Sequence, residues 1–423
     1  MVASGRAEED EVGHGVLGDI RVADFSRVLA GPYATMLLAD FGADVIKIEA
    51  PAGDDTRHWA PPVDATGRAT YFGGVNRNKR SVVLDLADAA GLAEARRLAT
   101  SADVVIENFR PGVMARFGLD HEAVRAVNPG VVYCSITGFG TGEGTALPGY
   151  DLLVQAVGGL MSITGPRDGE ASKVGVALVD VLAGQNAVAG ILLALRERDR
   201  TGEGQLVEVS LLQSLLSALT NQASSTLATG TPPRRMGNQH PSIAPYAVFR
   251  AADRDLVIAV GNDKQFRALA EVLGAPELAD DARFRGNAAR VAHRDELRAA
   301  IEQALAAASE AHWVDALTRA GVPAGIVNDV AEAIAFAESL GLEPVAEIEE
   351  ADAPARPGLG TLAALAPRPA QAHRSIANPI GLSASPADYR TAPPALGEHG
   401  GADWLPRARP LARPQDSSPK GPR

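Results

Sequence analysis

The sequence predicts an α/β protein with a Rossmann-like, doubly wound parallel sheet and a second, smaller α+β domain. In the first half of the chain, short runs rich in Val and Ile alternate with segments of helical character. Such nearly continuous apolar runs are typical of parallel strands that are covered on both faces. After about residue 228 mostly helical segments follow. The length of 423 residues also favours two domains over one.

The predicted strands of the large sheet begin near the N-terminus and are separated by helices. The strands are Arg21–Phe25, Ala43–Glu49, Ser81–Leu86, Asp103–Asn108 and Val131–Ile136. Between them, Tyr33–Asp40 is predicted as a helix that Gly42 ends, and Asp88–Thr100 as an Ala-rich helix. This alternation indicates helices on both faces of one sheet.

A further apolar run, Val174–Val179, leads through Asp180 into a predicted helix over Leu182–Arg198. Leu206–Leu219 is expected to start as a strand and continue as a helix. Past the linker-like Thr231–Arg235, the predicted elements are a strand pair and then helices. They are Ala247–Arg250, Leu256–Val260, Gln265–Leu273, His293–Ala308 and Ala311–Ala320.

These patterns divide the chain into segments. Residues 17–228 are predicted as the first part of the large domain and 229–345 as the small domain. Residues 346–402, rich in Pro, Ala and Gly from 355 to 400, are expected to return and pack on the large domain. Residues 1–16 and 403–423 are expected to be disordered, because they are polar or rich in Pro and basic residues.

Composition excludes several classes of partner. The net charge is -12, with 52 acidic against 40 basic residues, which gives no nucleic-acid footprint. The N-terminus lacks a signal peptide's basic start and apolar stretch, and no apolar run approaches the ~20 residues that span a bilayer. We therefore expect a soluble cytoplasmic protein with neither a nucleic-acid nor a membrane partner.

Metal, disulfide and dinucleotide chemistry are also not expected. Cys134 is the single cysteine, so an internal disulfide is impossible, and a buried thiol is the simplest reading. The eight histidines are scattered without metal-ligand spacing. Glu143 stands where a dinucleotide fingerprint over Gly138–Gly144 would require glycine. We predict no bound cofactor and no metal.

Asp180 stands out because it follows an apolar run and precedes an apolar helix. In an open parallel sheet, ligands bind outside the carboxyl ends of the strands, and a nearby helix N-terminus favours negative charge. The structural alternative is a helix N-cap, a role that Asp often has, and the two roles are compatible. Asp151 gives a second carboxylate nearby, with a turn or cap residue as its own alternative.

Two basic clusters adjoin predicted strands. Asn76–Arg80 leads into Ser81, and Asn108–Gly112 follows a strand, with Arg116 soon after. Both are compatible with ordinary solvated loops. Their positions beside the sheet also suit cations that meet phosphate groups.

At this point a set of motifs, in order along the chain, resembles the family III CoA-transferases, which include formyl-CoA transferase and a related branch of 2-methylacyl-CoA racemases. The matching segments run from about residue 17 to 400. They are Val22–Pro32, Gly42–Glu49, Asn78–Ser81, Asn108–Gly112, Gly149–Asp151, Gly158–Met161, Val179–Asp180, Gly237–Pro241, Gly321–Gly325 and Leu396–His399.

The resemblance implies a large Rossmann-like domain, a small domain and an interlocked homodimer. It implies that Asp180 is the catalytic nucleophile, with Asp151 and Tyr150 in support, and that a coenzyme A thioester is the substrate. It also implies CoA contacts at Leu29, Ala30, Leu84, Asp85, Leu86, Ala87, Asn108, Phe109, Arg110, Arg116, Leu147, Pro148, Gly149 and Tyr150.

Two departures from the transferase pattern concern these contacts. The family's transferase has a glutamine where Leu29 stands, so an amide that orients the acyl group is missing. It has an arginine where Ala50 stands, which puts one adenine contact in doubt.

The resemblance predicts a transferase that moves CoA from an acyl-CoA donor to a small carboxylic acid through an aspartyl anhydride and an aspartyl-CoA thioester. The racemase branch has His-Asp where this chain has Tyr150-Asp151, and racemisation needs two proton-transfer groups. Tyrosine, with an ordinary pKa near ~10, substitutes poorly, so racemase is the weaker alternative. A non-catalytic acyl-CoA binding protein is a third.

The segments Gly149–Asp151 and Gly158–Gly165 resemble those of transferases that use succinyl-CoA or another dicarboxylyl-CoA as the donor. Arg234 and Arg235 could meet a second carboxylate, although a solvated linker is the simpler interpretation of this pair.

Overall fold

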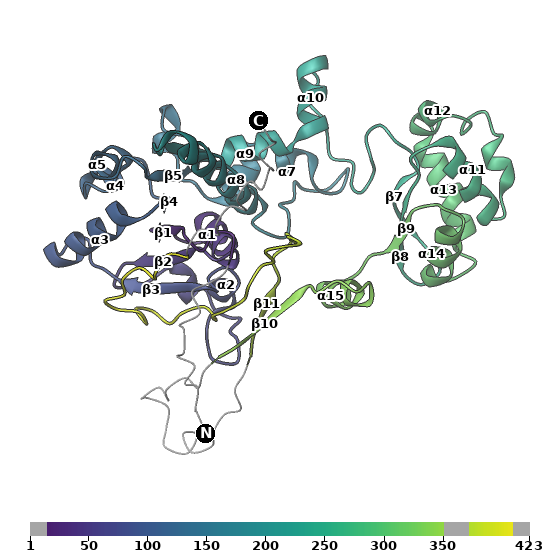
Figure 1. Cartoon of the computed structure of the whole chain (residues 1–423). Coiled ribbons are helices and arrows are strands. Elements are labelled where there is room, and N and C mark those ends of the chain that lie inside the picture. The colour runs from purple at the N-terminus through teal and green to yellow at the C-terminus, as the bar shows by residue number, and fades with distance from the viewer. Residues whose placement is uncertain (1–14, 351–371, 409–423) are drawn as a thin grey trace, which may run out of the picture. The chain divides into compact units, whose positions relative to one another are not determined.

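The computed structural model describes residues 15–350 and 372–408, which form two compact units (Figure 1). Among these residues, the first unit holds the chain up to Gly158, Val176–Thr220 and the chain from Glu343 onward. The second unit holds Gly159–Gly175 and Asn221–Leu342. The chain thus passes between the units repeatedly.

A six-stranded parallel sheet forms the centre of the first unit, in the order β3-β2-β1-β4-β5-β6. Its strands are β1 (Arg21–Asp24), β2 (Asp44–Glu49), β3 (Lys79–Val83), β4 (Val104–Glu107), β5 (Val132–Thr137) and β6 (Leu206–Ser210). The strand order reverses between β1 and β4, which is the switch point of a doubly wound sheet. The predicted parallel α/β sheet is confirmed.

Helices cover both faces of this sheet. On one face, Ala23, Ile46 and Val105 belong to a buried cluster with Leu98 of α3. On the other face, α1 and α8 pack against each other and against the sheet. The helices of the unit are α1 (Ala30–Asp40), α2 (Thr70–Gly73), α3 (Ala89–Ser101), α4 (Val113–Arg116), α5 (His121–Val127), α6 (Asp151–Val157), α8 (Leu178–Thr201) and α9 (Leu211–Ala218), with 3₁₀ turns η1 (Asp55–His58) and η2 (Glu143–Ala146).

The apolar run Val174–Val179 is not a strand, contrary to the pattern-based expectation. Helix α8 already begins at Leu178, and Val176 is 61% exposed. The sixth position of the sheet belongs instead to β6, which continues directly into α9 as predicted for Leu206–Leu219. Short apolar runs do not by themselves separate a strand from the start of a buried helix.

Helix α8, with 24 residues, is long and apolar enough to cross a membrane by length and composition. The prediction that no apolar stretch approaches the length of a membrane span is therefore wrong for α8. In the folded chain α8 packs on α1, α9, β5 and β6, while Leu192 and Leu193 stay exposed.

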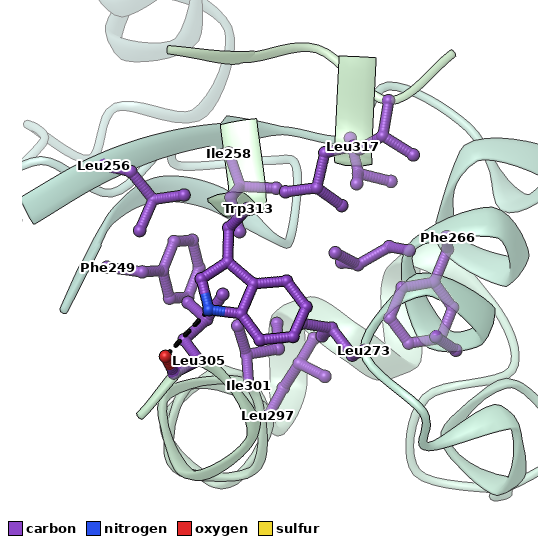
Figure 2. Close-up of a cluster of buried hydrophobic side chains, with 14 of the residues drawn as sticks. Phe249, Leu256, Ile258, Phe266, Leu273, Leu297, Ile301, Leu305, Trp313 and Leu317 are labelled. Carbon is purple, nitrogen blue, oxygen red and sulfur yellow. Dashed lines mark hydrogen bonds between the residues drawn. The ribbon is translucent and has the colours of Figure 1, made fainter. Parts of the chain in front are cut away.

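The second unit has its own core, built on an antiparallel sheet of β7, β8 and β9. Figure 2 shows Trp313 among side chains from two strands and several helices, with its indole Nε1 donating to the Leu305 carbonyl at 2.8 Å. The elements are β7 (Tyr246–Arg250), β8 (Asp255–Ala259), β9 (Ala324–Ile326), α7 (Leu160–Ile163), α10 (Thr220–Thr229), α11 (Asp263–Val272), η3 (Pro276–Ala279), α12 (Asn287–Ala292), α13 (Arg294–Leu305), α14 (Glu310–Arg319) and α15 (Val330–Ser339).

Residues 159–175, assigned by sequence to the large domain, group with the second unit. Hydrogen bonds account for this: the Gly237 amide donates to the Gly165 carbonyl at 3.1 Å, and Arg235 Nη2 donates to the Gly169 carbonyl at 3.0 Å. Arg167 also forms an ion pair with Asp295. These contacts attach residues 159–175 to the smaller unit.

The returning chain joins the first unit through a two-stranded antiparallel ribbon of β10 (Val345–Glu349) and β11 (Ala372–Ile376). Residues 403–408, expected to be disordered, are instead held in place: Trp404 Nε1 donates to Ser101 Oγ at 2.8 Å, and Arg407 pairs with Asp103. Residues 15 and 16 are likewise ordered, with the Gly15 carbonyl accepting from the Gly18 N–H at 2.9 Å, and the remaining predicted disorder, residues 1–14 and 409–423, lies outside the described residues.

Candidate active site

Asp180 lies in the first turn of α8, three residues after the Ala177 N-cap position. Its side chain is partly buried. Among residues 15–350 and 372–408, no hydrogen bond or ion pair satisfies either of its carboxylate oxygens. A partly buried carboxylate with no protein partner keeps both oxygens available for chemistry.

The cap of α8 comes from Asp151, at the start of α6. Asp151 Oδ1 accepts from the backbone N–H of Val179 at 2.8 Å and of Asp180 at 3.4 Å. Ala177, at the N-cap position itself, provides no side-chain bond. The N-cap alternative for Asp180 is therefore wrong, and the cap alternative for Asp151 is right, although the helix that it caps is α8.

This arrangement limits what the start of α8 can do in catalysis. Free backbone N–H groups at the start of a helix can donate to the oxyanion of a tetrahedral intermediate. Two of them donate to Asp151, and the N–H of Leu178 donates to the Val176 carbonyl at 2.8 Å. The first turn of α8 has already committed these donors, so it does not supply the oxyanion contacts.

Burial and charge together make Asp180 an unusual acid. Desolvation, and then the neighbouring charge of Asp151, raise the pKa of Asp180 to about 7. Burial disfavours the charged form, and a second carboxylate adds repulsion. A group with such a pKa changes its charge near neutral pH, which is common among catalytic side chains.

Tyr71, which sequence reasoning missed, shares this environment. Desolvation raises its pKa to about 12, with the charges of Asp180 and Asp151 adding to the effect. Its ring meets Trp59 edge-on, with 5.1 Å between ring centroids. The hydroxyl therefore remains a neutral donor. No local pattern marks Tyr71, because only the tertiary fold brings α2 near α8.

Several predicted CoA-contact positions lie where strands of the sheet end. Leu29 and Ala30 stand at the N-cap and first position of α1, directly after the β1 loop. Val28 in this loop has a φ of 69°, in the left-handed region that a β-branched residue avoids. Its N–H is held by Asp54 at 3.2 Å. Backbone strain of this kind is a reason to look for function.

The loop after β4 is tied to the loop after β1. Asn108 Oδ1 accepts from the Arg27 N–H at 2.8 Å, and Asn108 Nδ2 donates to the Arg27 carbonyl at 2.7 Å. Phe109 is partly buried beneath the Arg27 guanidinium. Arg110 and Arg116 are exposed and, within the described part of the chain, form no ion pair. They are available cations.

The other predicted contacts form two separate stretches. Leu84–Ala87 makes the turn between β3 and α3, in which the Ala87 N–H donates to Asp85 Oδ1 at 2.9 Å. Leu147–Tyr150 connects η2 to α6, and the Tyr150 side chain is 67% exposed. The CoA contacts of these two stretches stay predictions.

The basic cluster Asn76–Arg80 has a structural role, contrary to the suggestion that it meets phosphate. Arg77, 1% exposed, pairs with Asp40 at 2.7 Å. Lys79, also 1% exposed, pairs with Asp24 at 3.2 Å. Charges are buried in proteins when they are paired, and these cations already have partners.

Two further expectations can be placed. In the described residues no group of three or more His, Cys, Asp or Glu side chains is arranged to hold a metal ion. Arg234 and Arg235 belong to the second unit, where Arg234 is exposed and Arg235 bonds Gly169.

Comparison with known proteins agrees with the resemblance seen in the sequence. The model of CoA-transferase family III matches residues 17–400. The succinate--glutarate CoA-transferase of Agrobacterium fabrum is 43% identical over 390 residues, which cover 90% of this chain and 93% of that protein. The acetyl-CoA:oxalate CoA-transferase of Acetobacter aceti is 45% identical over 322 residues, covering 75% of this chain and 82% of that protein.

A solved structure leads to the same group. The crystal structure of a CAIB/BAIF family protein from Brucella suis is similar with a TM-score of 0.78 and 41% sequence identity. The similarity covers 90% of this chain and 96% of that one. Both the family match and these relatives extend over most of the sequence, and so the chain belongs to CoA-transferase family III.

Proposed function

We propose that this protein transfers CoA from a dicarboxylyl-CoA, such as succinyl-CoA, to a small carboxylic acid, with Asp180 as the nucleophile. The observation that carries the proposal is the Asp180 carboxylate itself: partly buried, unpaired in the described chain, and with its pKa raised to about 7 by desolvation and Asp151. The substrate class rests on the names of relatives that use succinate, glutarate or oxalate.

The reaction proceeds through covalent intermediates on Asp180. Its carboxylate attacks the thioester carbonyl of the donor and expels CoA thiolate, which leaves a mixed anhydride. The thiolate attacks the Asp180 acyl carbon, forming an aspartyl-CoA thioester and releasing the donor acid. The acceptor carboxylate attacks this thioester and again expels thiolate. Attack of the thiolate on the acceptor acyl carbon gives the new acyl-CoA and restores Asp180.

The predicted CoA contacts accompany this mechanism. Arg110 and Arg116 are exposed cations near the carboxyl end of β4 and suit the phosphate groups of CoA. The loop of Leu29 and Ala30 is proposed to border the pantetheine arm. Hydrolysis of the anhydride must be prevented, which requires the bound substrate to exclude water.

An interlocked homodimer and a cytoplasmic location complete the proposal. The homodimer follows from the family resemblance. Cytoplasmic location fits the packing of α8, the one helix of the described chain long and apolar enough to span a membrane, on α1, α9, β5 and β6.

The test of the nucleophile is chemical. After incubation with succinyl-CoA, hydroxylamine should trap an acyl-enzyme as a hydroxamate on Asp180, located by mass spectrometry. Asp180→Ala should abolish both the label and CoA transfer to glutarate. Asp199→Ala is the matched control, because Asp199 is exposed on the same helix. Ordinary transfer by Asp180→Ala, or labelling elsewhere, would contradict the proposal.

A further inference from the structure

Gln155 is a buried side chain for which the reaction described above has no use. It lies on α6, one turn after Asp151, and none of its surface is exposed. Its Nε2 donates to Asp151 Oδ2 at 2.6 Å, and the Val176 carbonyl lies 3.5 Å from the same nitrogen. Burial of an amide costs free energy unless it is hydrogen-bonded, so these contacts define where Gln155 can sit.

With this bond, both oxygens of Asp151 are engaged. Oδ1 faces the N–H groups of Val179 and Asp180, and Oδ2 faces the Gln155 amide. Without the amide, Oδ2 would lose its hydrogen-bond donor among the described residues, and the carboxylate could rotate about its last side-chain bond. The orientation of Asp151 therefore depends on Gln155.

We propose that Gln155 is a positioning residue for acyl transfer, whose amide holds the Asp151 carboxylate against the start of α8 so that its charge faces Asp180. The inference rests on the proposed role of Asp180 as the nucleophile. Gln155 itself contacts no reacting atom and acts through Asp151. A fixed negative neighbour keeps Asp180 basic, and a more basic nucleophile is intrinsically more reactive, as thiolates show.

Among the groups around Asp180, Asp151 is the one whose charge affects its ionisation. Among the described residues, the charged group that perturbs Asp180 is Asp151. Tyr71 of α2 faces the pair as a neutral hydroxyl. Helix α9 carries no titratable side chain. The titratable groups on the other elements packed against α8 are Tyr33 and Asp40 of α1, Tyr133 and Cys134 of β5, and Glu208 of β6.

The experiment compares kcat/KM against pH for the wild type and Gln155→Met, with succinyl-CoA and glutarate as substrates. Methionine retains the length of the side chain and removes both amide donors. The acidic limb of the profile should move to lower pH by roughly 0.5–1 unit, because Asp180 loses part of its negative neighbour. The limiting kcat should fall by about 10-fold, while KM for succinyl-CoA stays unchanged.

Val154→Ala is the matched control. Val154 is the buried neighbour on the same helix, so its truncation loosens α6 and leaves the amide in place. It should lower Tm and leave the acidic limb where the wild type has it. If Gln155→Met lowers Tm in the same way without moving the limb, Gln155 is only structural and the inference is overturned.

A second variant and a separate readout keep the test decisive. Gln155→Asn retains the amide on a shorter side chain that cannot reach Oδ2, so it should also move the limb, and it replaces Gln155→Met if that variant fails to fold. Failure of the wild type to label at Asp180 with hydroxylamine overturns the nucleophile and this inference together. Normal labelling with an unmoved limb in both variants overturns the inference alone.

Discussion

At the level of single residues, Asp180 in the first turn of α8 lies beside Asp151 of α6, where burial and the neighbouring charge disfavour its ionised form. Asp151 is held there by the hydrogen bonds that it accepts from the helix and from Gln155. Asp180 lacks such bonds within the described chain and carries the electrostatic cost. A site of this kind lowers the stability of the folded protein and raises the reactivity of the carboxylate, and the loss of stability can be measured.

Replacement of Asp180 by Asn should stabilise the protein in a pH-dependent way. The pKa of Asp180, about 7 in the folded chain, lies above its ordinary value because of desolvation and Asp151. Between these two values the folded state binds more protons than the unfolded state, so stability falls as pH rises through this window. The penalty is complete above pH ~7, where Asp180→Asn should be more stable by about 1–2 kcal/mol, a value reduced for partial solvent screening.

Urea denaturation near pH ~8 and near pH ~5 measures this difference. The gain should shrink at the lower pH, where Asp180 is largely protonated in the folded protein. Asp199→Asn, on the exposed part of the same helix, should show no such dependence. A gain equal at both pH values would show that charge on Asp180 is not its cause.

The same ionisation should govern activity. Only the ionised carboxylate attacks a thioester, so kcat/KM should fall about tenfold per pH unit below an apparent pKa near that of Asp180, about 7. Asp151→Asn removes the neighbouring charge and retains an oxygen that can cap α8. Its acidic limb should move to lower pH by roughly 0.5 unit or more. An unchanged limb in Asp151→Asn would mean that another group sets the profile.

At the level of elements, the sequence predicted the sheet well and the start of α8 poorly. Most strands of the parallel sheet contain short runs rich in Val and Ile, a pattern that can be read from the sequence. Val174–Val179 has the same local character, and its state is decided by Asp151, which is distant in sequence and binds the N–H groups of 179 and 180. Tertiary contacts likewise decide that β6, and not Val174–Val179, takes the last position in the sheet.

The candidate site shows the same division. Asp180 and Asp151 were predicted from their motifs, and the fold brings them together. Tyr71 and Gln155 carry no local signal, because their roles arise only when α2 and α6 meet the start of α8. For Asn76–Arg80 the sequence suggested a phosphate-binding loop where the structure has buried ion pairs. The residue types of an exposed basic loop and of buried ion pairs are the same, so the sequence alone does not separate them.

That buried pair gives a prediction about how elements are joined. Arg77 Nε and Nη2 donate to both oxygens of Asp40 at the end of α1, and its Nη1 donates to Ser375 Oγ of β11 at 2.8 Å. Asp40→Asn leaves the guanidinium buried without its counter-charge. The free energy of unfolding should fall by about 3–5 kcal/mol.

The matched control is Glu197→Gln, which breaks the exposed pair of Glu197 with Arg200 in the same unit. Exposed pairs contribute little, so its cost in urea denaturation should be under about 1 kcal/mol. Equal costs for the two variants would show that burial does not strengthen the dependence of Arg77 on Asp40.

At the level of the whole molecule, each unit has a core of its own, but the chain does not complete one unit before starting the other. The first unit is assembled from stretches that end at Gly158 and Thr220 and resume at Val176 and Glu343. The resuming stretch adds the β10–β11 ribbon and the contacts of Trp404 and Arg407. A chain that leaves a unit and returns to it makes a closed path, and such a path can be threaded by a second chain.

The proposed interlocked homodimer therefore makes a kinetic prediction. Two closed paths that pass through each other cannot separate while both stay folded, so subunit exchange requires unfolding and should be as slow as unfolding itself. Tagged and untagged dimers mixed in native buffer should yield no mixed dimer on affinity capture, whereas joint denaturation and refolding should produce it. Co-expression of the two forms is the control that mixed dimers are stable. Elution as a monomer in size-exclusion chromatography with light scattering would contradict the dimer, and rapid exchange would contradict the interlocking alone.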